Sequence, residues 1–384
     1  MQYYCRLVTR QYWISQILTR FERVPVVWLS GVRRAGKTVL AKSLPGVEYF
    51  DCELPSVRRM IEDPESFWRG RRGLVALDEV HRLQRPSEVL KIAADHFSHL
   101  RVLATSSSTL GASARFGDTL TGRKADVWLT PMIEDDRMAF GGLPVEHRLA
   151  QGGLPGFYQT NRLSEDAVQE WIDSFWSRDI QELFRIERRA SFLRLFELLF
   201  AQSGAIFEAS NLAGPCEVSR GTVQNYLAVL EASLVVHRVR PFHTHQAAEI
   251  VAAPKVYGFD TGFVRALNDW RELRPSDYGV LWEHYVLNEL RARYPRAEIR
   301  YWRDKQKHEV DFVVRARPAA APTAIECKWR ASAFHPQGLR AFRRRYPGGP
   351  NLVVCRDVDQ PYERRFGDLT VWFMPLGPAI ESLL

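Results

Sequence analysis

The chain has 384 residues, of which 46% are hydrophobic, and it carries a formal net charge of +8. This length suits two or three domains with buried cores, and the composition excludes a chain that is disordered throughout. No apolar run approaches the roughly 18 residues that span a bilayer, so we expect no membrane partner. The excess positive charge favours a polyanionic partner, with DNA as the first expectation, although many basic proteins bind none.

The cysteines and the N-terminus indicate the cellular compartment. The first residues, MQYYCRLVTRQYW, lack the apolar centre and small-residue cleavage site of a secretory signal. The cysteines are scattered without a CxxC pair, which argues against a zinc ribbon and against a secreted disulfide framework. We therefore expect a cytoplasmic protein with reduced thiols at Cys5, Cys52, Cys216, Cys327 and Cys355.

A phosphate-binding pattern follows the first apolar run. Val24–Ser30 reads VPVVWLS, which predicts a buried strand, and residues 31–38 read GVRRAGKT, which fits G-x-x-x-x-G-K-T. VLAKSL then opens a helix. Glycines let the backbone N–H groups face phosphates, and the helix N-terminus adds a favourable dipole. Lys37 is expected to reach the β- and γ-phosphates of ATP, and the Thr38 hydroxyl to bind Mg²⁺.

A second apolar run ends in two carboxylates. Residues 73–83 read GLVALDEVHRL, which predicts a buried parallel strand ending at Asp78 and Glu79. Asp78 would hold Mg²⁺ directly or through water, and Glu79 would orient or deprotonate the water that attacks the γ-phosphate. The alternative, a strand followed by an acidic helix cap, is disfavoured by the phosphate loop upstream.

Two further signals belong to the same region. Arg101–Leu103 predicts a strand leading into ATSSST, where Thr105 or Ser106 is a candidate sensor of the γ-phosphate, although such clusters are also common in loops. In LTGR, Arg123 is either an arginine finger for a neighbouring subunit's nucleotide or a surface arginine. A finger of this kind requires a homo-oligomer, and the sequence leaves that state open. The candidate nucleotide contacts are Gly31, Arg34, Gly36, Lys37, Thr38, Asp78 and Thr105.

Together, GVRRAGKT, ALDEVHRL, the TSSS strand end and LTGR resemble a known family. It comprises bacterial and archaeal AAA-type ATPases that carry an appended C-terminal domain of uncharacterised function. The resemblance implies a P-loop NTPase domain with ATP and Mg²⁺ as cofactors. In that family the hydroxyl-rich strand end usually contains a glycine, and here Ser106 takes its place.

The middle of the chain predicts helices. Trp171–Leu183 and Phe192–Phe200 have apolar spacings suited to helices. Arg178 and Asp179 match an Arg-Asp pair of the family, and Arg178 is either a second finger candidate or a partner in a local ion pair.

Residues 208–241 predict a helix-turn-helix with a wing. A short helix at Asn211–Ala213 is followed by a turn and by a second helix from Ser219 to Ser233, and LVVHRVRP then predicts a strand. Those residues near the start of the second helix that face outward are candidates for DNA contact: Arg220, Thr222, Asn225 and Tyr226. A lid or packing role on the ATPase is the favoured alternative, because Gly221 interrupts the first turn and few basic residues lie nearby.

The last third of the chain places acidic residues in apolar elements. The helix GVLWEHYVLNELRARYP contains Glu283, and the strands IRYWRDK, EVDFVV and AIECKW follow, with Asp311 in the second. Glu326 and Lys328 are two residues apart and therefore project from the same side of the third strand. Two carboxylates suit a divalent ion, and a lysine beside them would stabilise developing negative charge. The alternative is ion pairing of Lys328 with Glu326 or Asp311 and no metal.

This order resembles the restriction-endonuclease-like fold of PD-(D/E)xK nucleases. The resemblance implies Asp311 and Glu326 as metal ligands, Lys328 as a catalytic group, and Glu283 as a further ligand or a partner that orients Lys328. KVYGFDTGF, residues 255–263, resembles a signature of the appended domain. Nearby basic residues are candidates for phosphate contacts or for a solvated helix face: Arg303, Lys305, Lys307, Arg340, Arg343, Arg344 and Arg345.

The expected fold is therefore α/β, with a three-layer P-loop NTPase domain (1–140), a helical and winged-helix domain (141–245) and a restriction-endonuclease-like α/β domain (246–384). We expect Lys37, Glu79 and Arg123 to act in ATP hydrolysis, and Asp311, Glu326 and Lys328 in binding or cleaving DNA. The alternatives are an ATP-dependent DNA-binding or branch-migrating machine without nuclease activity, and a nucleotide-controlled switch that binds a protein.

Overall fold

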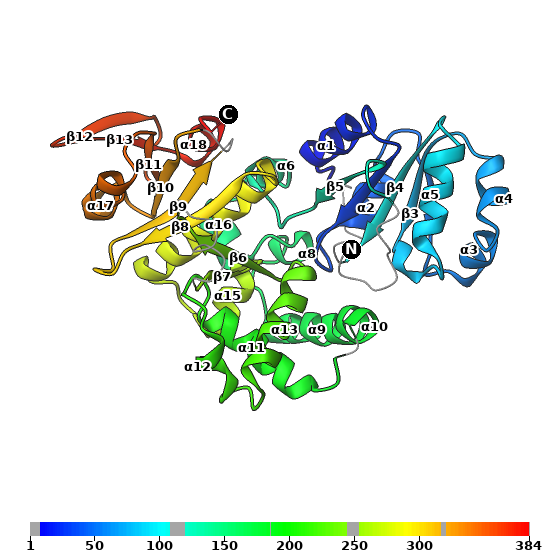
Figure 1. The fold of residues 1–384 in the computed structure, drawn as a ribbon, viewed down its shortest axis with the longest axis horizontal. Helices are drawn as coiled ribbons and strands as arrows, with labels where there is room; N and C mark the ends of the chain where they lie inside the picture. Colours follow the sequence, from blue (N-terminus) through cyan, green and yellow to red (C-terminus); the bar gives the residue numbers. More distant parts are fainter. Residues whose placement is uncertain (1–7, 108–119, 185, 244–252, 316–319, 384) are drawn as a thin grey trace.

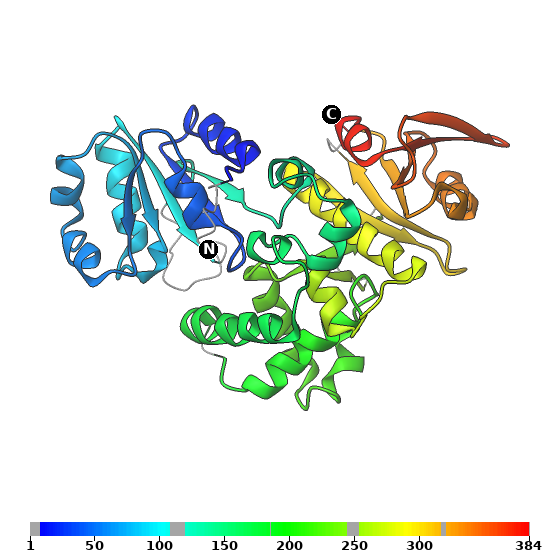
Figure 2. The same cartoon turned by 180° about the vertical axis from the view of Figure 1, so that it is seen from behind.

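The computed structural model describes residues 8–107, 120–184, 186–243, 253–315 and 320–383. Figure 1 shows an N-terminal α/β part, a helical middle and a C-terminal part built on a second sheet. Figure 2 gives the reverse view, in which the helical middle lies below and between the two sheets. Within the described ranges, no helix is both long and apolar enough to cross a bilayer.

The N-terminal part is a parallel sheet in the order β2-β3-β4-β1-β5. Its strands are β1 (Val26–Ser30), β2 (Glu48–Asp51), β3 (Gly73–Asp78), β4 (Leu100–Ser106) and β5 (Lys124–Trp128). The central strands are buried on both faces, as their continuous apolar runs predict. Because all strands run in parallel, the segments that follow β1, β3 and β4 meet at one edge.

Helices cover both faces of this sheet. Side chains of α1 (Gln11–Phe21) and α2 (Lys37–Lys42) join one apolar core, which includes Val27 and Leu29 of β1. The opposite face packs against α3 (Pro55–Met60), α4 (Pro64–Arg69) and α5 (Pro86–His96) in a second core. The α/β class and the layered nucleotide domain are therefore confirmed.

The middle part is helical as predicted, with elements close to the expected ranges. Its helices are α6 (Glu134–Ala139), α7 (Val145–Gln151), α8 (Pro155–Tyr158), α9 (Glu165–Phe175), α10 (Gln181–Phe184), α11 (Arg189–Ala201), α12 (Ala209–Ala213) and α13 (Arg220–Ala232). A π-helical turn, Trp176–Ile180, interrupts the expected helix between α9 and α10. Ser219 caps α13 by accepting a hydrogen bond from the Thr222 amide.

Two strands follow α13 and belong to the second sheet. β6 (Val236–Pro241) pairs antiparallel with β7 (Lys255–Gly258) and parallel with β8 (Glu298–Arg303). The strand expected to form the wing therefore ties the helical middle to the C-terminal sheet. It ends before residue 245, the expected domain boundary, but it pairs with strands that lie beyond that residue. The position of that boundary stays a prediction.

The second sheet has the order β12-β13-β11-β10-β9-β8-β6-β7 and is mixed. Its remaining strands are β9 (Glu309–Arg315), β10 (Thr323–Lys328), β11 (Asn351–Cys355), β12 (Tyr362–Phe366) and β13 (Leu369–Met374). The helices of this region are α15 (Thr261–Leu267), α16 (Pro275–Arg293), α17 (Gln337–Arg345) and α18 (Leu376–Glu381). β9 runs antiparallel to β10, and β10 runs parallel to β11. The strands predicted from EVDFVV and AIECKW are thus present, and they lie side by side.

Candidate functional site

The phosphate loop curls between the end of β1 and the start of α2, as its sequence predicts. Gly36 has a φ of 97° and Arg34 a φ of 64°, so the loop depends on left-handed backbone at both positions. A Cβ added to Gly31 would lie 2.7 Å from the Leu129 carbonyl oxygen, just beyond β5. Glycine is therefore required at position 31 by close packing and at position 36 by conformation.

Lys37 lies over this loop. Its side chain is buried, and Nζ donates hydrogen bonds to the carbonyl oxygens of Gly31 at 2.9 Å and Val32 at 3.3 Å. The ammonium group is thus held over the curl where the phosphates of a nucleotide would bind.

Asp78 gathers three hydroxyl groups at the end of β3. Thr38 Oγ1 and Tyr49 Oη each donate to Asp78 Oδ2 at 2.7 Å, and Thr105 Oγ1 donates to Oδ1. Hydroxyl and carboxylate oxygens are hard ligands that suit Mg²⁺, so the donor set of Thr38 and Asp78 fits this ion. The structure brings together the predicted residues Lys37, Thr38, Asp78 and Thr105.

Glu79 lies beside this group in a left-handed conformation, with a φ of 51°. Its backbone N–H donates to Thr105 Oγ1 at 3.0 Å, so Thr105 links both acidic residues. Burial raises the pKa of Glu79, whereas the Lys37 ammonium opposes that shift. A carboxylate with a raised pKa suits a general base better than an ordinary exposed glutamate does.

The sequence did not predict the contacts that the helical middle makes with the phosphate loop. Arg33 Nε lies 2.9 Å from Asp179 Oδ2, and the Arg33 carbonyl accepts a hydrogen bond of 3.0 Å from Trp171 Nε1. Arg34 pairs with Glu170 of α9, and its contact with a nucleotide stays a prediction. The Arg-Asp pair was the available signal, but nothing in the sequence connected Asp179 to Arg33.

Tyr49 was also missed, because a tyrosine in a short edge strand is ordinary core composition.

Arg123, the first finger candidate, lies away from the phosphate loop of its own chain. The backbone of Arg123 bonds to Val26 at the start of β1, whereas the loop follows the end of that strand. The Arg123 side chain pairs with Asp95 of α5. Arg178 lies 3.7 Å from Glu53, which is an ion pair with a residue far away in the sequence and not the local pair that the alternative expected. A finger role for Arg123 would have to act in trans and stays a prediction.

The C-terminal residues Asp311, Glu326 and Lys328 converge. Lys328 Nζ lies 2.6 Å from Glu326 Oε2 and 3.3 Å from Asp311 Oδ2. The Cys327 amide donates to Asp311 Oδ2 at 2.7 Å. Burial and the neighbouring Asp311 raise the pKa of Glu326 to about 8. Burial alone would also raise the pKa of Asp311, but Lys328 and Lys255 more than offset it, so that the pKa is lowered.

A second charged group adjoins this one. Tyr257 Oη donates to Glu283 Oε1 at 2.6 Å, and Lys255 Nζ lies 3.6 Å from the same oxygen and 2.5 Å from Glu309 Oε1. Burial raises the pKa of Glu283. Among the described residues, no group of three or more His, Cys, Asp or Glu side chains is arranged to hold a metal ion. The role of Glu283 as a further ligand stays a prediction.

Some of the other candidate nucleic-acid contacts are exposed to solvent, whereas others are buried or bonded within the fold. Tyr226 is buried against Phe192, so it does not face outward from α13. Arg220 and Asn225 are exposed, and Thr222 is partly exposed. Arg343 is bound to the carbonyl oxygens of Pro322 and Pro350 and is a structural residue, whereas Arg344 and Arg345 are exposed.

Three protein families match successive parts of the chain. Residues 23–135 match an AAA domain, residues 144–274 match a domain of unknown function (DUF8612), and residues 278–377 match another (DUF4143). Uncharacterized proteins of Mycobacterium bovis and Mycobacterium tuberculosis are each 30% identical over 88% of this chain and 78% of their own length. The AAA match covers the phosphate loop, Asp78 and Glu79, so these residues lie in an AAA-type ATPase domain.

Solved structures give weaker likenesses. A Walker-type ATPase of Pyrococcus abyssi is 16% identical, with a TM-score of 0.43 over 68% of this chain and 97% of that protein. A RuvB variant of Thermotoga maritima is 14% identical, with a TM-score of 0.29 over 63% of this chain and 91% of the RuvB chain. At these scores the likeness is too weak to carry a conclusion.

Proposed function

Because the chain belongs to the same family as the two mycobacterial proteins and contains an AAA domain, we propose that it hydrolyses Mg-ATP at the phosphate loop. The observation that carries this proposal is the convergence of Lys37, Thr38, Asp78 and Glu79 at one edge of the parallel sheet. The alternative of a strand with an acidic cap would not require Thr38 and Thr105 to bond the same carboxylate.

Each residue has a distinct role in this proposal. The amides of the loop and Lys37 bind the phosphates, and Thr38 with Asp78 would hold Mg²⁺, which neutralises negative charge on the β- and γ-phosphates. Glu79 takes the proton from the attacking water. Thr105 bonds both the Asp78 carboxylate and the Glu79 amide, so it fixes the two acids relative to each other.

The rate of phosphate release from ATP by the Lys37→Ala variant, compared with the wild type, tests this assignment. We expect loss of at least 100-fold in kcat/KM, because a charged group that stabilises the transition state is removed. Lys91→Ala is the matched control, since Lys91 is an exposed lysine of the same domain. Hydrolysis that survived in the Lys37 variant would show that the activity belongs to another site.

We also propose that the C-terminal part is a PD-(D/E)xK-like domain that acts on DNA. The supporting observation is that Lys328 contacts both Asp311 and Glu326 where β9 and β10 lie side by side. The chain order α16, β8, β9, β10, α17 and β11 gives a helix, three strands, a helix and a strand around this group. Such a buried cluster of opposite charges is costly to maintain without a function or complete pairing.

A cleavage panel tests this second proposal. Plasmid, single-stranded and branched DNA are incubated with Mg²⁺ or Mn²⁺, with and without ATP. Cleavage by the wild type that disappears in Asp311→Ala and persists in Asp359→Ala would support a nuclease; Asp359 is an exposed acid of the same region. Binding of DNA without cleavage would favour an ATP-dependent DNA-binding or branch-migrating machine. Failure to bind DNA at low salt would favour a nucleotide-controlled protein switch.

A further inference from the structure

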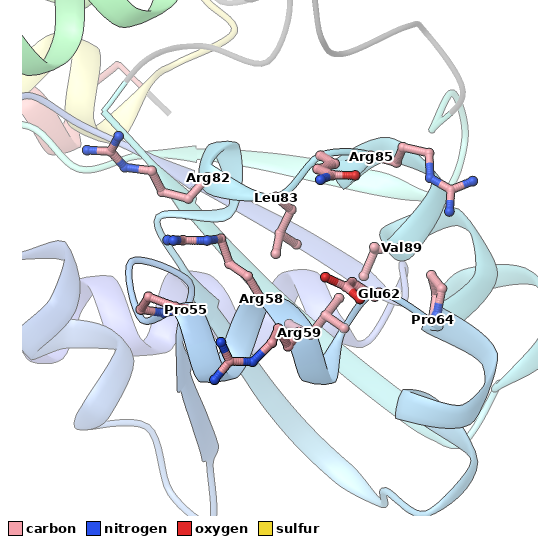
Figure 3. A pocket seen from close by; sticks show the side chains of 11 residues that line it. Pro55, Arg58, Arg59, Glu62, Pro64, Arg82, Leu83, Arg85 and Val89 are labelled. Atoms are coloured by element: carbon pink, nitrogen blue, oxygen red, sulfur yellow. The ribbon is translucent and has the colours of Figure 1, made fainter.

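A pocket of about 630 Å³ lies in the AAA domain, beside the segment that follows Glu79. One wall is formed by α3 and the start of α4, and the other by residues 82–89, which lead into α5. Figure 3 shows arginine side chains from both walls around it, with Leu83 and Val89 between them. None of the nucleotide-site residues described above lines this pocket.

The pocket is positively charged. Arg58, Arg59, Arg82 and Arg85 line it, and Glu62 is the acidic residue among its lining side chains. Arg58 donates to the backbone carbonyl oxygens of Cys52 and Glu53, which do not neutralise its charge, and within the described part of the chain no carboxylate pairs with it.

Nearby acids reduce this charge only in part. Arg82 lies 3.4 Å from Glu53, and Arg85 lies 2.9 Å from Glu88. Glu53, Glu62 and Glu88 are thus the acids that these contacts and the lining place beside the four arginines. The Arg85 pair is also largely exposed, so water and salt weaken it.

Arginine and apolar side chains together suit a nucleotide unit. A guanidinium group binds phosphate through a planar fork of donors and stacks on aromatic faces, including those of bases. Ile61, Leu83 and Val89 are buried side chains that line the same pocket and offer an apolar floor. In a single strand, an unstacked base can rotate outward and enter such a pocket. In a duplex, the bases stay stacked inside a convex backbone and cannot do so.

We propose that this pocket binds single-stranded nucleic acid, with backbone phosphates on the arginines and a base against the apolar floor. This inference specifies where the protein would bind DNA, and its biological role rests on the proposed action on DNA. It assigns the strand to the ATPase domain, away from the Asp311 and Glu326 site.

The position of the pocket links strand binding to hydrolysis. The backbone N–H of Arg82 bonds to the Glu79 carbonyl oxygen at 3.0 Å, and the turn Val80–Arg82 begins directly after Glu79. A strand held by Arg82 and Arg85 therefore acts on the turn that orients the proposed general base.

Fluorescence anisotropy with a labelled oligothymidylate tests the inference on nucleotide-free protein, so that the result does not depend on ATP hydrolysis. The test variant is Arg59→Glu with Arg85→Glu, because both side chains are exposed. We expect affinity at low salt to fall at least tenfold. The slope of log affinity against log salt should also become shallower by about 1.4, as for two lost phosphate contacts on a single strand.

The matched control is Arg23→Glu with Arg72→Glu. These are exposed arginines of the same domain that precede β1 and β3, at the opposite edge of the sheet. We expect the control to lose less than threefold in affinity, and thermal melting checks that both variants fold. Equal affinity and equal salt slope in the two variants would overturn the assignment of strand binding to this pocket. The proposed action on DNA at another site would not be affected. A wild type that bound no strand would overturn both this inference and the proposed action on DNA.

Competition identifies the ligand class. Thymidine monophosphate and inorganic phosphate, added at equal phosphate concentration, should displace the oligothymidylate only weakly. Displacement as strong as that by unlabelled oligothymidylate would show a small-anion site and would overturn strand binding.

Discussion

Asp78 accepts hydrogen bonds from Thr38, Tyr49 and Thr105, which come from three different elements of the nucleotide domain. Hydrogen bonds to a charged group are stronger than neutral ones, contributing roughly 1.5–3 kcal/mol each. The three donors therefore hold the carboxylate in one orientation before any ion binds. Tyr49 is the donor with no direct role in the proposed chemistry. A change at Tyr49 therefore tests how much the orientation of the Asp78 carboxylate contributes.

Tyr49→Phe removes one donor and keeps the ring. We expect the Mg²⁺ concentration for half-maximal ATP hydrolysis to change by three- to tenfold, while kcat at saturating Mg²⁺ stays within about twofold, because Asp78 retains its other partners. A Mg²⁺ titration of the hydrolysis rate measures this, with the exposed Tyr362→Phe as control. A large loss of kcat with unchanged Mg²⁺ dependence would mean that Tyr49 supports the fold or the nucleotide rather than the ion site.

At the scale of elements, the π-helical turn Trp176–Ile180 places a buried acid against the phosphate loop. Asp179 is 2% exposed, one of its oxygens contacts Arg33, and the other has no partner among the described residues. π-Helical turns insert a residue into a helix and often occur at functional sites. Here the turn faces Arg33, so the helical middle is tied directly to the loop that binds phosphates.

Arg33→Gln, Asp179→Asn and the double variant form a cycle that measures this tie. We expect a coupling energy of roughly 1–3 kcal/mol from urea unfolding, because one partner is buried and removal of either charge leaves the other unpaired. The pair of Arg34 and Glu170 is the control, since its side chains are 40% and 68% exposed and its coupling should be below about 1 kcal/mol. Equal coupling in the two pairs would contradict a special role for the turn.

The same elements show what the sequence can and cannot predict. The strand, glycine loop and helix around Lys37 were predictable because the motif and its context are contiguous. Glu326 and Lys328 were predictable as a pair because strand periodicity places them on one side. The π-turn was not, because WSRDI fits an ordinary helical pattern and only its packing against Arg33 distinguishes it.

Longer-range pairing was also beyond the sequence. Lys255 and Tyr257 reach Glu283 only because β7 pairs with β6, which in turn pairs with β8. No local pattern specifies that order of strands.

Across the whole molecule, α16 joins the C-terminal sheet to α6, the first helix of the middle part. Trp282 Nε1 donates to the Val354 carbonyl oxygen of β11, and Tyr285 Oη donates to Glu134 at the start of α6. Glu289 Oε1 accepts a hydrogen bond of 2.5 Å from the Glu134 amide. One continuous apolar core runs through these parts. Opening the contact between α16 and α6 should therefore affect the stability of the whole chain.

Glu289 makes that contact sensitive to pH. Burial raises its pKa from 4.5 to about 7, although the Glu134 amide and Arg293 oppose the shift. Between these two values the folded chain retains a proton that the unfolded chain has lost. This residue's contribution to stability therefore decreases as pH rises from about 4.5 to about 7, and it is constant outside that window.

Glu289→Gln removes this titration while keeping an oxygen that accepts from the Glu134 amide. The free energy of unfolding of the wild type minus that of the variant should fall by an amount on the order of 1–3 kcal/mol between pH 4.5 and 7.5. Urea unfolding across this range measures the difference, and subtraction cancels the titration of groups that both proteins share. Glu298→Gln, at an exposed position of β8, should give a difference that is flat within about 0.5 kcal/mol. A flat or rising difference for Glu289→Gln would show that Glu289 is ionised in the folded chain throughout, with Arg293 and the α6 amide stabilising its charge.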